Sequence, residues 1–239
     1  MTLEFELTPH VLNSFPEARV SALRVKGLKA FALAPQGVEL VAKAAQIVAQ
    51  TFASTEDLVA DPRIEAWRKA YSAIGAKPSK FRSSIEALAR RAIKGAPLSI
   101  GIPAVDIYNS ASLETLSPLG AYDCAHLPSG KLVMRLADPS QDTFNPLGGT
   151  AADFPLHKEL VVYATGEKIL CWGFNCRDSQ ETCLSETTDE AIFFGEAAFA
   201  THHQSLQNAM GKLQVLFKGM GTECGSIETA DILKPTFNV

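Results

Sequence analysis

Polar side chains interrupt the apolar stretch from Gly101 to Ala137, and this stretch constrains the fold more than any other part of the chain. An apolar run ends at Asp106, Asn109 follows three residues later, and Arg135 lies inside a second apolar run. A globular chain places such groups beside its core only where they are paired or used, because an unpaired buried polar group costs free energy. The stretch therefore predicts buried polar pairs or a functional site.

The composition predicts one globular unit. The chain has 239 residues, of which 46% are hydrophobic, and this is enough for one large core, so we expect a single domain over residues 1–239. The formal net charge is −4, and no run of like charges forms the basic tail or stripe that grips nucleic acid by charge alone. No signal-peptide core and no membrane-length apolar run occurs. We therefore expect a cytoplasmic protein that binds neither membrane nor DNA.

No motif indicates a metal, a nucleotide or another cofactor. The cysteines are odd in number and include no C-x-x-C pair, which favours structural thiols in a reducing compartment. His202 and His203 are adjacent, so they cannot both face one ion on a helix. No phosphate-binding glycine loop and no G-x-S-x-G nucleophile motif occurs. We therefore expect no cofactor and no metal site.

Helical signals occur in several segments. Asp61 followed by Pro62 is typical of a helix start, because Asp caps the first turn and Pro needs no hydrogen-bond partner there. Ser83, with Glu86 three residues later, has the pattern of a capping box. Apolar residues at helical spacing mark the other helices. The helices expected are residues 37–52, 63–74, 84–94 and 203–218.

Alternating or apolar runs predict the strands. Gly166 indicates the turn of a hairpin between two of them. In the segment 191–197 either helix or strand is possible, but alternation places Ile192, Phe194 and Glu196 on one face and favours a strand. Residues 19–34, interrupted by Gly27, are expected to form a strand pair or one strand with a bulge. The other strands expected are residues 132–137, 160–164, 169–174, 191–197 and 226–232. The fold class expected is α+β, with a mostly antiparallel sheet flanked by helices.

Glu196 is the strongest candidate for a functional group. It lies in the run I-F-F-G-E-A-A-F, where a carboxylate needs hydrogen-bond donors or must take up a proton. Asp123 and Arg135 can form a buried ion pair, which we favour slightly over a catalytic role for either. Asn109 can instead cap a turn.

The start of the helix over 84–94 is a candidate anion site. Lys77, Lys80 and Arg82 precede it, and a helix N-terminus with basic neighbours suits a carboxylate or a phosphate. An ordinary cap with solvated basic residues remains the alternative interpretation.

Two runs resemble the B3/B4 module of the phenylalanyl-tRNA synthetase β chain. The run D-I-Y-N-S-A-S-L-E-T-L-S-P-L-G-A-Y-D, residues 106–123, is similar to the synthetase run D-V-T-N-Y-V-x-L-E-x-G-Q-P-x-H-A-F-D. The run T-T-D-E-A-I-F-F-G-E-A-A-F, residues 187–199, resembles the synthetase run T-x-N-I-x-L-E-x-A-x-F and sets Glu196 at its glutamate. The resemblance is strongest over residues 80–200 and includes no synthetase catalytic core.

Free-standing B3/4 domain proteins are more similar still. They share W-x-x-x-Y at Trp67 and Tyr71, P-x-K-x-R-S-S at residues 78–84, and R-x-S-x-x-T at residues 177–182. The resemblance therefore implies a B3/B4-like domain.

The resemblance also implies a site. In the synthetase the module hydrolyses tyrosine wrongly attached to the phenylalanine tRNA, with a histidine, a glutamate and an asparagine. Asn109 and Glu196 match the last two and are the implied catalytic residues. Gly120 stands at the histidine and Tyr108 at a threonine, which disfavours a side-chain general base and favours a substrate-assisted or water-positioning mechanism. The implied substrate-binding residues are Arg82, Ser83, Tyr108, Gly120, Asp123, Arg177, Ser179 and Thr182.

The resemblance thus implies a stand-alone domain that hydrolyses the ester bond of a mischarged aminoacyl-tRNA without ATP. We expect Asn109, Arg177 and Glu196 to line one cleft, with the helix start at Ser83 on its rim. The expected partner is an aminoacyl-tRNA or an amino-acid-like small molecule. A non-catalytic pocket for such a molecule, or a structural or interaction domain, are the alternatives.

Overall fold

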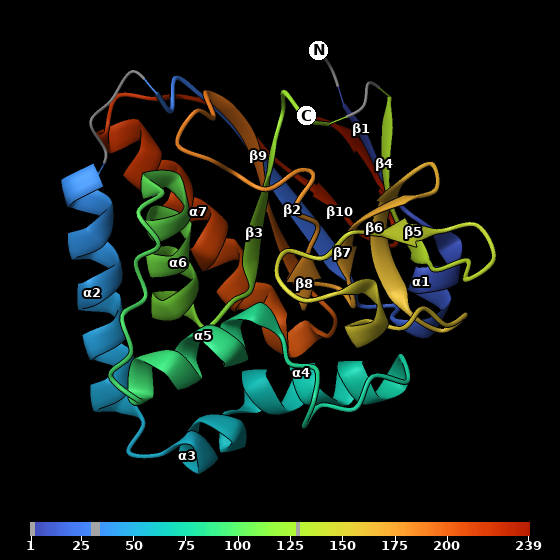
Figure 1. Ribbon diagram of the computed structural model, residues 1–239, viewed down its shortest axis with the longest axis horizontal. Coiled ribbons are helices and arrows are strands. Elements are labelled where there is room, and N and C mark those ends of the chain that lie inside the picture. Colours follow the sequence, from blue (N-terminus) through green and yellow to red (C-terminus); the bar gives the residue numbers. More distant parts are fainter. Residues whose placement is uncertain (1–2, 30–33, 128–129) are drawn as a thin grey trace.

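The computed structural model describes residues 3–29, 34–127 and 130–239, which fold into helices and two β-sheets (Figure 1). The helices are α1 (Pro9–Ser14), α2 (Ala34–Thr51), α3 (Thr55–Ala60), α4 (Pro62–Ala73), α5 (Ser84–Ile93), α6 (Pro103–Thr115) and α7 (His203–Gly219), with 3₁₀ turns at Ala151–Asp153 and Ala200–His202. The strands are β1 (Glu4–Leu7), β2 (Arg19–Lys26), β3 (Leu119–Asp123), β4 (Lys131–Leu136), β5 (Thr143–Phe144), β6 (Val161–Thr165), β7 (Lys168–Trp172), β8 (Arg177–Asp178), β9 (Glu190–Ala197), β10 (Glu223–Ala230) and β11 (Thr236–Asn238).

The two sheets differ in size and are mostly antiparallel. The larger sheet has the order β11-β1-β4-β6-β7-β5, with β8 paired to β7, and the smaller sheet has the order β10-β2-β9-β3. Parallel pairing joins β1 to β4 and β5 to β7. The expected α+β class is confirmed, although the single sheet that we expected is a pair of sheets.

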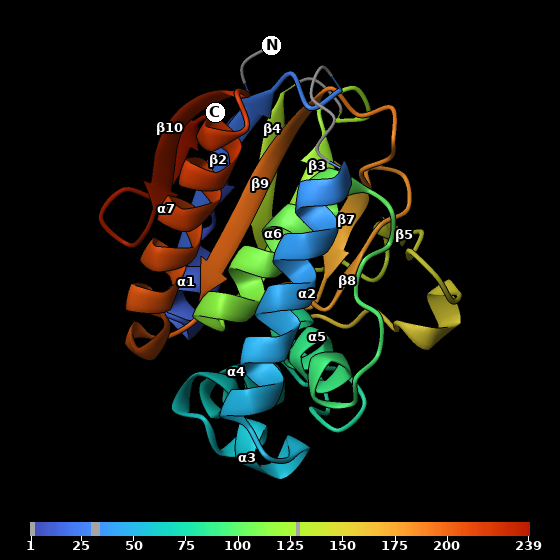
Figure 2. The same ribbon diagram turned by 90° about the vertical axis from the view of Figure 1, so that its left-hand side faces the viewer.

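The sheets pack face to face, and helices cover the outer face of the smaller sheet. Phe194 of β9 contacts Phe5, Tyr122 and Tyr163 between the sheets, with ring centroids 5.7, 5.5 and 5.6 Å away. On the opposite face of β9, Phe193 contacts Phe217 of α7, with centroids 4.8 Å apart. Figure 2 shows α6 and α7 over this face, with α2 outside α6. The order of layers is therefore helices, smaller sheet and larger sheet.

Strand β9 has the alternation that the sequence indicates. Ile192, Phe194 and Glu196 point towards the larger sheet, while Phe193 and Gly195 point towards the helices. The 191–197 segment is therefore a strand, as expected, and β9 pairs with β2 and β3 over its length.

The expected helices are confirmed within one to three residues at each end, and so is the hairpin of β6 and β7, whose turn contains Gly166 at φ 55°. The strand expected over 19–34 ends at Lys26, before Gly27 at φ 80°, and its residues 30–33 lie outside the described part of the chain.

Helix α6 was not predicted. It begins at Pro103 and ends where Leu116 adopts a left-handed conformation, with φ 50°. It packs closely against α2, since a Cβ added to Gly37 would lie 3.1 Å from the Pro103 carbonyl oxygen. Asp106, Asn109 and Ser112 thus lie on a helix whose buried face is rich in small side chains.

We expect Gly195→Val to lower the free energy of unfolding by about 1–3 kcal/mol, because overpacking a core forces neighbouring side chains to move. A Cβ at residue 195 would lie 2.8 Å from Leu206, 2.9 Å from Leu119 and 3.2 Å from Met210. The matched control is Gly211→Ala in α7, where no atom lies within 4 Å, and we expect a gain of about 0.5–1 kcal/mol. Urea unfolding measures both, and a Gly195→Val protein as stable as wild type would contradict this packing.

Candidate functional site

Space for an added side chain lies at Gly120, and we call this space the Gly120 opening. Gly120 is on β3, the edge strand of the smaller sheet, and shares its face with Tyr122, whose ring contacts Tyr163 of the larger sheet. A Cβ added to Gly120 would meet a single atom within 4 Å, an Asp178 carboxylate oxygen at 4.0 Å. Since the backbone here is ordinary extended strand, the glycine leaves space that a side chain could fill.

Asp178 brings a carboxylate to this opening from the larger sheet. It lies on β8 directly opposite Cys171 of β7. Burial raises the pKa of Asp178, while the Cys171 thiol and the Arg177 charge oppose this shift. A partly buried carboxylate of this kind is stabilised by a cation that enters beside it.

Tyr108 of α6 lies on the helix side of the smaller sheet, within electrostatic reach of Asp178. Its ring packs on Phe193, with centroids 6.1 Å apart, and burial, followed by the nearby Asp178 carboxylate, raises the pKa of its hydroxyl. Asn109 is the next residue on α6 and is half-buried. Neither the Tyr108 hydroxyl nor the Asn109 side chain hydrogen-bonds to another described residue.

Glu196 lies deeper between the sheets and is only 3% exposed. The Tyr163 hydroxyl donates to one carboxylate oxygen at 2.7 Å, and the Asn175 side-chain amide donates to the other at 3.3 Å. Burial raises the pKa of Glu196 to about 8, the Asp178 charge adds to this shift, and the two donors oppose it. At neutral pH Glu196 is therefore mostly protonated, whereas an exposed glutamate is ionised.

Asn175 connects Glu196 to the start of α5. Its side-chain carbonyl accepts hydrogen bonds from the Tyr71 hydroxyl and from the Ser84 backbone N–H, each at 3.2 Å. The loop that carries it contains Phe174 in a left-handed conformation, with φ 57°. Such a conformation costs free energy in a non-glycine residue and persists where the surroundings enforce it.

The W-x-x-x-Y motif supplies these surroundings. Trp67 packs against Phe174, with ring centroids 5.7 Å apart, and stacks on His202 at 4.6 Å. Tyr71 donates to the Gly173 carbonyl at 2.7 Å as well as to Asn175. The motif therefore positions the Asn175 loop.

Ser83 and Arg82 precede α5, as expected. The Ser83 hydroxyl caps the helix by accepting the Glu86 backbone N–H at 3.3 Å. The Glu86 side chain does not complete a capping box, because it turns to three arginines instead. Arg82 donates to the Ser79 carbonyl at 2.7 Å and lies 3.6 Å from the Glu86 carboxylate.

The residues of R-x-S-x-x-T anchor loops. Arg177 is exposed, donates to the Leu147 carbonyl at 3.1 Å, and lies 5.3 Å from the centre of the Phe154 ring. Ser179 accepts the Glu181 backbone N–H at 3.2 Å. The Thr182 carbonyl accepts the backbone N–H of Asp123 at the end of β3, at 3.0 Å.

The structure joins some of the predicted site residues and not others. Glu196 is linked to the Ser83–Ser84 helix start through Asn175. No contact between described residues joins Arg177 or Asn109 to Glu196, so the cleft expected to contain all three stays a prediction. Asp178 was not predicted as a site residue, although it lies between Arg177 and Ser179 in the R-x-S-x-x-T motif.

The expected ion pair between Asp123 and Arg135 is wrong. Asp123 ends a strand of the smaller sheet and accepts a hydrogen bond from the Thr188 hydroxyl at 2.6 Å. Arg135 lies on β4 of the larger sheet and pairs with Asp142, with N–O distances of 2.6 and 2.8 Å. The two residues lie on different sheets, and each has its own partner.

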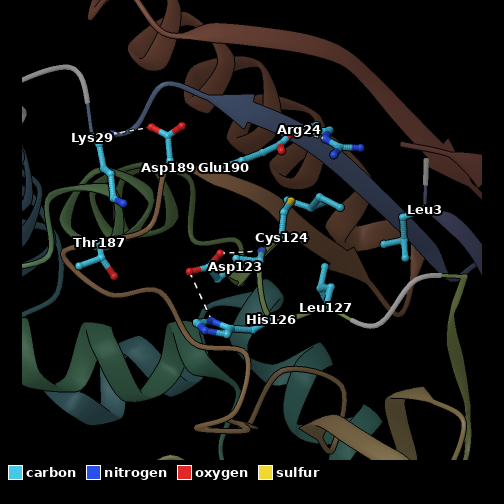
Figure 3. Close-up of a pocket in the computed structure, with 12 residues that line it drawn as sticks. Leu3, Arg24, Lys29, Asp123, Cys124, His126, Leu127, Thr187, Asp189 and Glu190 are labelled. Atoms are coloured by element: carbon cyan, nitrogen blue, oxygen red, sulfur yellow. Dashed lines mark hydrogen bonds and ion pairs between the residues drawn. The ribbon is translucent and has the colours of Figure 1, made fainter. Parts of the chain in front are cut away.

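A cavity of about 490 Å³ lies beside Asp123 (Figure 3). Its walls carry charges of both signs. Arg24 and Glu190 form an ion pair at 2.6 Å, and His126 lies 3.5 Å from the Asp123 carboxylate. Burial raises the pKa of the Cys124 thiol in this cavity to about 11, so this cysteine is not an activated nucleophile. The lining also includes Leu3, Lys29, Ala125, Leu127, Thr187, Asp189 and Ile192.

No cluster of three metal-ligating side chains occurs among the described residues. His202 and His203 contact different partners, the Arg63 and Glu17 carbonyls, at 3.0 and 2.7 Å. Within the same residues, no helix combines the length and apolar character that crossing a bilayer requires.

The chain is thus an α+β domain in which the Asp178 carboxylate of the larger sheet approaches Gly120 at the edge of the smaller sheet. A sequence profile of the B3/4 domain matches residues 66–210, which is more than half of the chain. The chain belongs to the B3/4 domain family, and the resemblance seen in the sequence is confirmed at this level.

Among solved structures, the chain is similar to an N-terminal fragment of the phenylalanyl-tRNA synthetase β-subunit from Pyrococcus horikoshii. The identity is 12% and the TM-score is 0.44. The alignment covers 93% of this chain and 50% of the fragment, so the chain spans half the length of that structure. No curated protein sequence matches the chain significantly.

We expect the free energy of unfolding to fall as the pH rises from about 4.5 to about 8. In this range folded Glu196 retains a proton that the unfolded chain releases, because its pKa rises from 4.5 to about 8 on folding. The loss approaches about 1.4 kcal/mol per pH unit where the difference is one full proton. Glu196→Gln should have a flatter profile in urea titrations, and equal slopes in both proteins would show that Glu196 ionises normally.

Proposed function

We propose that this domain hydrolyses the ester bond between a wrongly attached amino acid and its tRNA. The Gly120 opening is the observation that carries the proposal, because space for a ligand group lies there beside the Asp178 carboxylate and within electrostatic reach of the Tyr108 hydroxyl. Such a combination is typical of a ligand site. Membership of the B3/4 family supports the choice of ligand, since similar modules occur in phenylalanyl-tRNA synthetase.

In this proposal the aminoacyl group enters beside Asp178. An aminoacyl ester carries an α-ammonium group at neutral pH, and the Asp178 carboxylate supplies the opposite charge in a partly desolvated place. The ammonium stabilises the ionised form of Asp178, so that burial no longer penalises the carboxylate alone. The Tyr108 hydroxyl and the Asn109 amide then supply hydrogen-bonding groups for the ester.

The reaction is attack by water on the ester carbonyl. The water oxygen forms a bond to the carbonyl carbon, the bond from that carbon to the ribose oxygen breaks, and the water proton passes to the departing ribose oxygen. Gly120 offers no side-chain base, so the substrate's own groups or a positioned water relay this proton. The Asn109 amide is proposed to donate to the carbonyl oxygen as negative charge develops there.

Glu196 is proposed to orient the ester or its water from the closed end of the opening. Its carboxyl is within electrostatic reach of Asp178, and Tyr163 and Asn175 fix its position. Preorganised groups of this kind contribute to rate through positioning.

We expect Asp178→Asn to lower kcat/KM for a mischarged aminoacyl-tRNA on the order of 10- to 100-fold, the effect of removing a hydrogen bond to a charged group. The same tRNA with an N-acetylated amino acid has no ammonium, so the variant should cleave it as fast as wild type does. Deacylation of both substrates is measured with Glu181→Gln, a nearby exposed carboxylate, as the control. An equal loss on both substrates would argue against the ammonium pair.

We expect Glu196→Gln to lower the deacylation rate on the order of 10²-fold, as loss of a positioning group does, while circular dichroism shows a folded protein. A panel of mischarged tRNAs identifies the substrate first. If Glu196→Gln cleaves as fast as wild type, Glu196 has only a structural role and the site lies elsewhere.

A second candidate function is non-catalytic binding of an amino-acid-like molecule. The cavity beside Asp123 favours it, because its volume and its walls of both charges suit a zwitterion. The discriminating outcome is wild-type protein that cleaves no mischarged tRNA but gains thermal stability with a free amino acid. A structural or interaction domain is the third possibility, which would show neither effect.

The proposal treats residues 1–239 as one functional unit. Pairing of β1 with both β4 and β11, and of β10 with β2, supports this, since strands from both ends of the sequence complete the sheets. Because aminoacyl-tRNA is a cytoplasmic substrate, the proposal also places the protein there.

A further inference from the structure

Positive charge is concentrated in one part of an acidic chain. Residues 62–99 contain nine lysines and arginines but two acidic residues, Glu65 and Glu86, whereas the whole chain has 22 basic and 26 acidic residues. This segment comprises α4, α5 and the loops beside them, and both helices lie together at one end of the sheets (Figure 1). The molecule therefore has a basic end and an acidic remainder.

Three arginines gather around one buried carboxylate at this end. Arg68 of α4 and Arg90 of α5 each place a guanidinium nitrogen 2.9 Å from the same oxygen of Glu86, and Arg82 lies 3.6 Å from it. Glu86 is fully buried, but the arginine side chains are 24–36% exposed. The Glu86 carboxylate thus holds three arginine side chains in place, and the group keeps a net positive charge. Because these side chains are already ordered, a ligand that binds them loses less side-chain conformational entropy.

Further cations flank these arginines in the sequence. Lys77 and Lys94 are exposed, and Lys80 lies 4.9 Å from the centre of the Phe81 ring. The rings of Phe81 and Phe154 have centroids 6.1 Å apart, and the Arg177 guanidinium lies over the Phe154 ring. We define the α4–α5 basic face by Arg68, Lys77, Lys80, Arg82, Arg90 and Lys94.

We propose that the α4–α5 basic face binds the sugar–phosphate backbone of RNA. Guanidinium groups match phosphate geometry through paired N–H donors, and Arg68, Arg82 and Arg90 retain donors beyond those that reach Glu86. The large exposed hydrophobic side chains of the described residues all lie outside residues 62–99. A membrane or an apolar peptide would need such side chains, whereas a polyanion needs charge alone.

The face is connected to the candidate site. The α5 start at Ser84 donates to Asn175, and Asn175 donates to Glu196. The start of α5 and the candidate site therefore share Asn175 as a hydrogen-bond partner. The identity of this RNA as tRNA rests on the proposed function, whereas RNA binding by the α4–α5 basic face does not.

Fluorescence anisotropy with uncharged tRNA tests the proposal. The test variant is Lys77→Glu with Lys94→Glu, because both lysines are exposed and neither neutralises Glu86. The control, Lys43→Glu with Lys218→Glu, changes the net charge equally on exposed residues of α2 and α7. We expect the test variant to bind about 10-fold more weakly or worse, and to lower the slope of log affinity against log salt by about 1 for each lost contact. The control should bind like wild type.

Hydrolysis of a small aminoacyl ester separates this proposal from the function above. Loss of tRNA binding with unchanged small-ester hydrolysis supports the basic face as the RNA surface. Equal tRNA binding by test and control variants overturns it, even if ester hydrolysis is found. Selective tRNA binding by a protein that hydrolyses no ester keeps this proposal and removes the other. Binding to vesicles with phosphatidylserine instead of tRNA overturns it in favour of a membrane surface.

Discussion

The hydrogen bond between Asn175 and Glu196 joins the smaller sheet to the loop that holds the start of α5, two parts that are distant in the sequence. Glu196 belongs to the smaller sheet, its partner Tyr163 to the larger one, and Asn175 to a loop that also holds the start of α5. A carboxyl group buried between two sheets is costly unless donors surround it, so the three elements must meet correctly for any of them to be stable. The left-handed Phe174 and the Trp67 and Tyr71 side chains serve the same arrangement.

Local signals predicted the elements that depend on local physics. The caps at Asp61 and Ser83 were predicted because cap chemistry is contained in a few adjacent residues. Helix α6 was missed because its buried face contains Ser110, Ala111 and Ser112, which give no apolar stripe, and because close packing against α2 stabilises it. Periodicity detects large apolar residues and is insensitive to helices that pack through small ones.

The candidate site was predictable only in part. The burial of Glu196 follows from its apolar neighbours in the sequence. The resemblance of the chain to the B3/B4 module pointed to Asn109 and Gly120. The approach of Asp178 to Gly120 depends on how the edges of two sheets meet, which no local pattern contains. The basic end of the molecule was predicted only in part, as the anion site of Lys77, Lys80 and Arg82, for a related reason. Its arginines are separated along the chain and meet only because α4 and α5 pack around Glu86.

The raised pKa of Glu196 makes the protonation of the core sensitive to its contents. In the proposed function, a cationic substrate group beside Asp178 stabilises the ionised forms of Asp178 and Glu196 and would lower the pKa of each. Near neutral pH such a cation would displace the proton that Glu196 holds. Under that proposal, ligand binding and proton release to the solvent are linked, and the affinity for a cationic ligand would rise with pH.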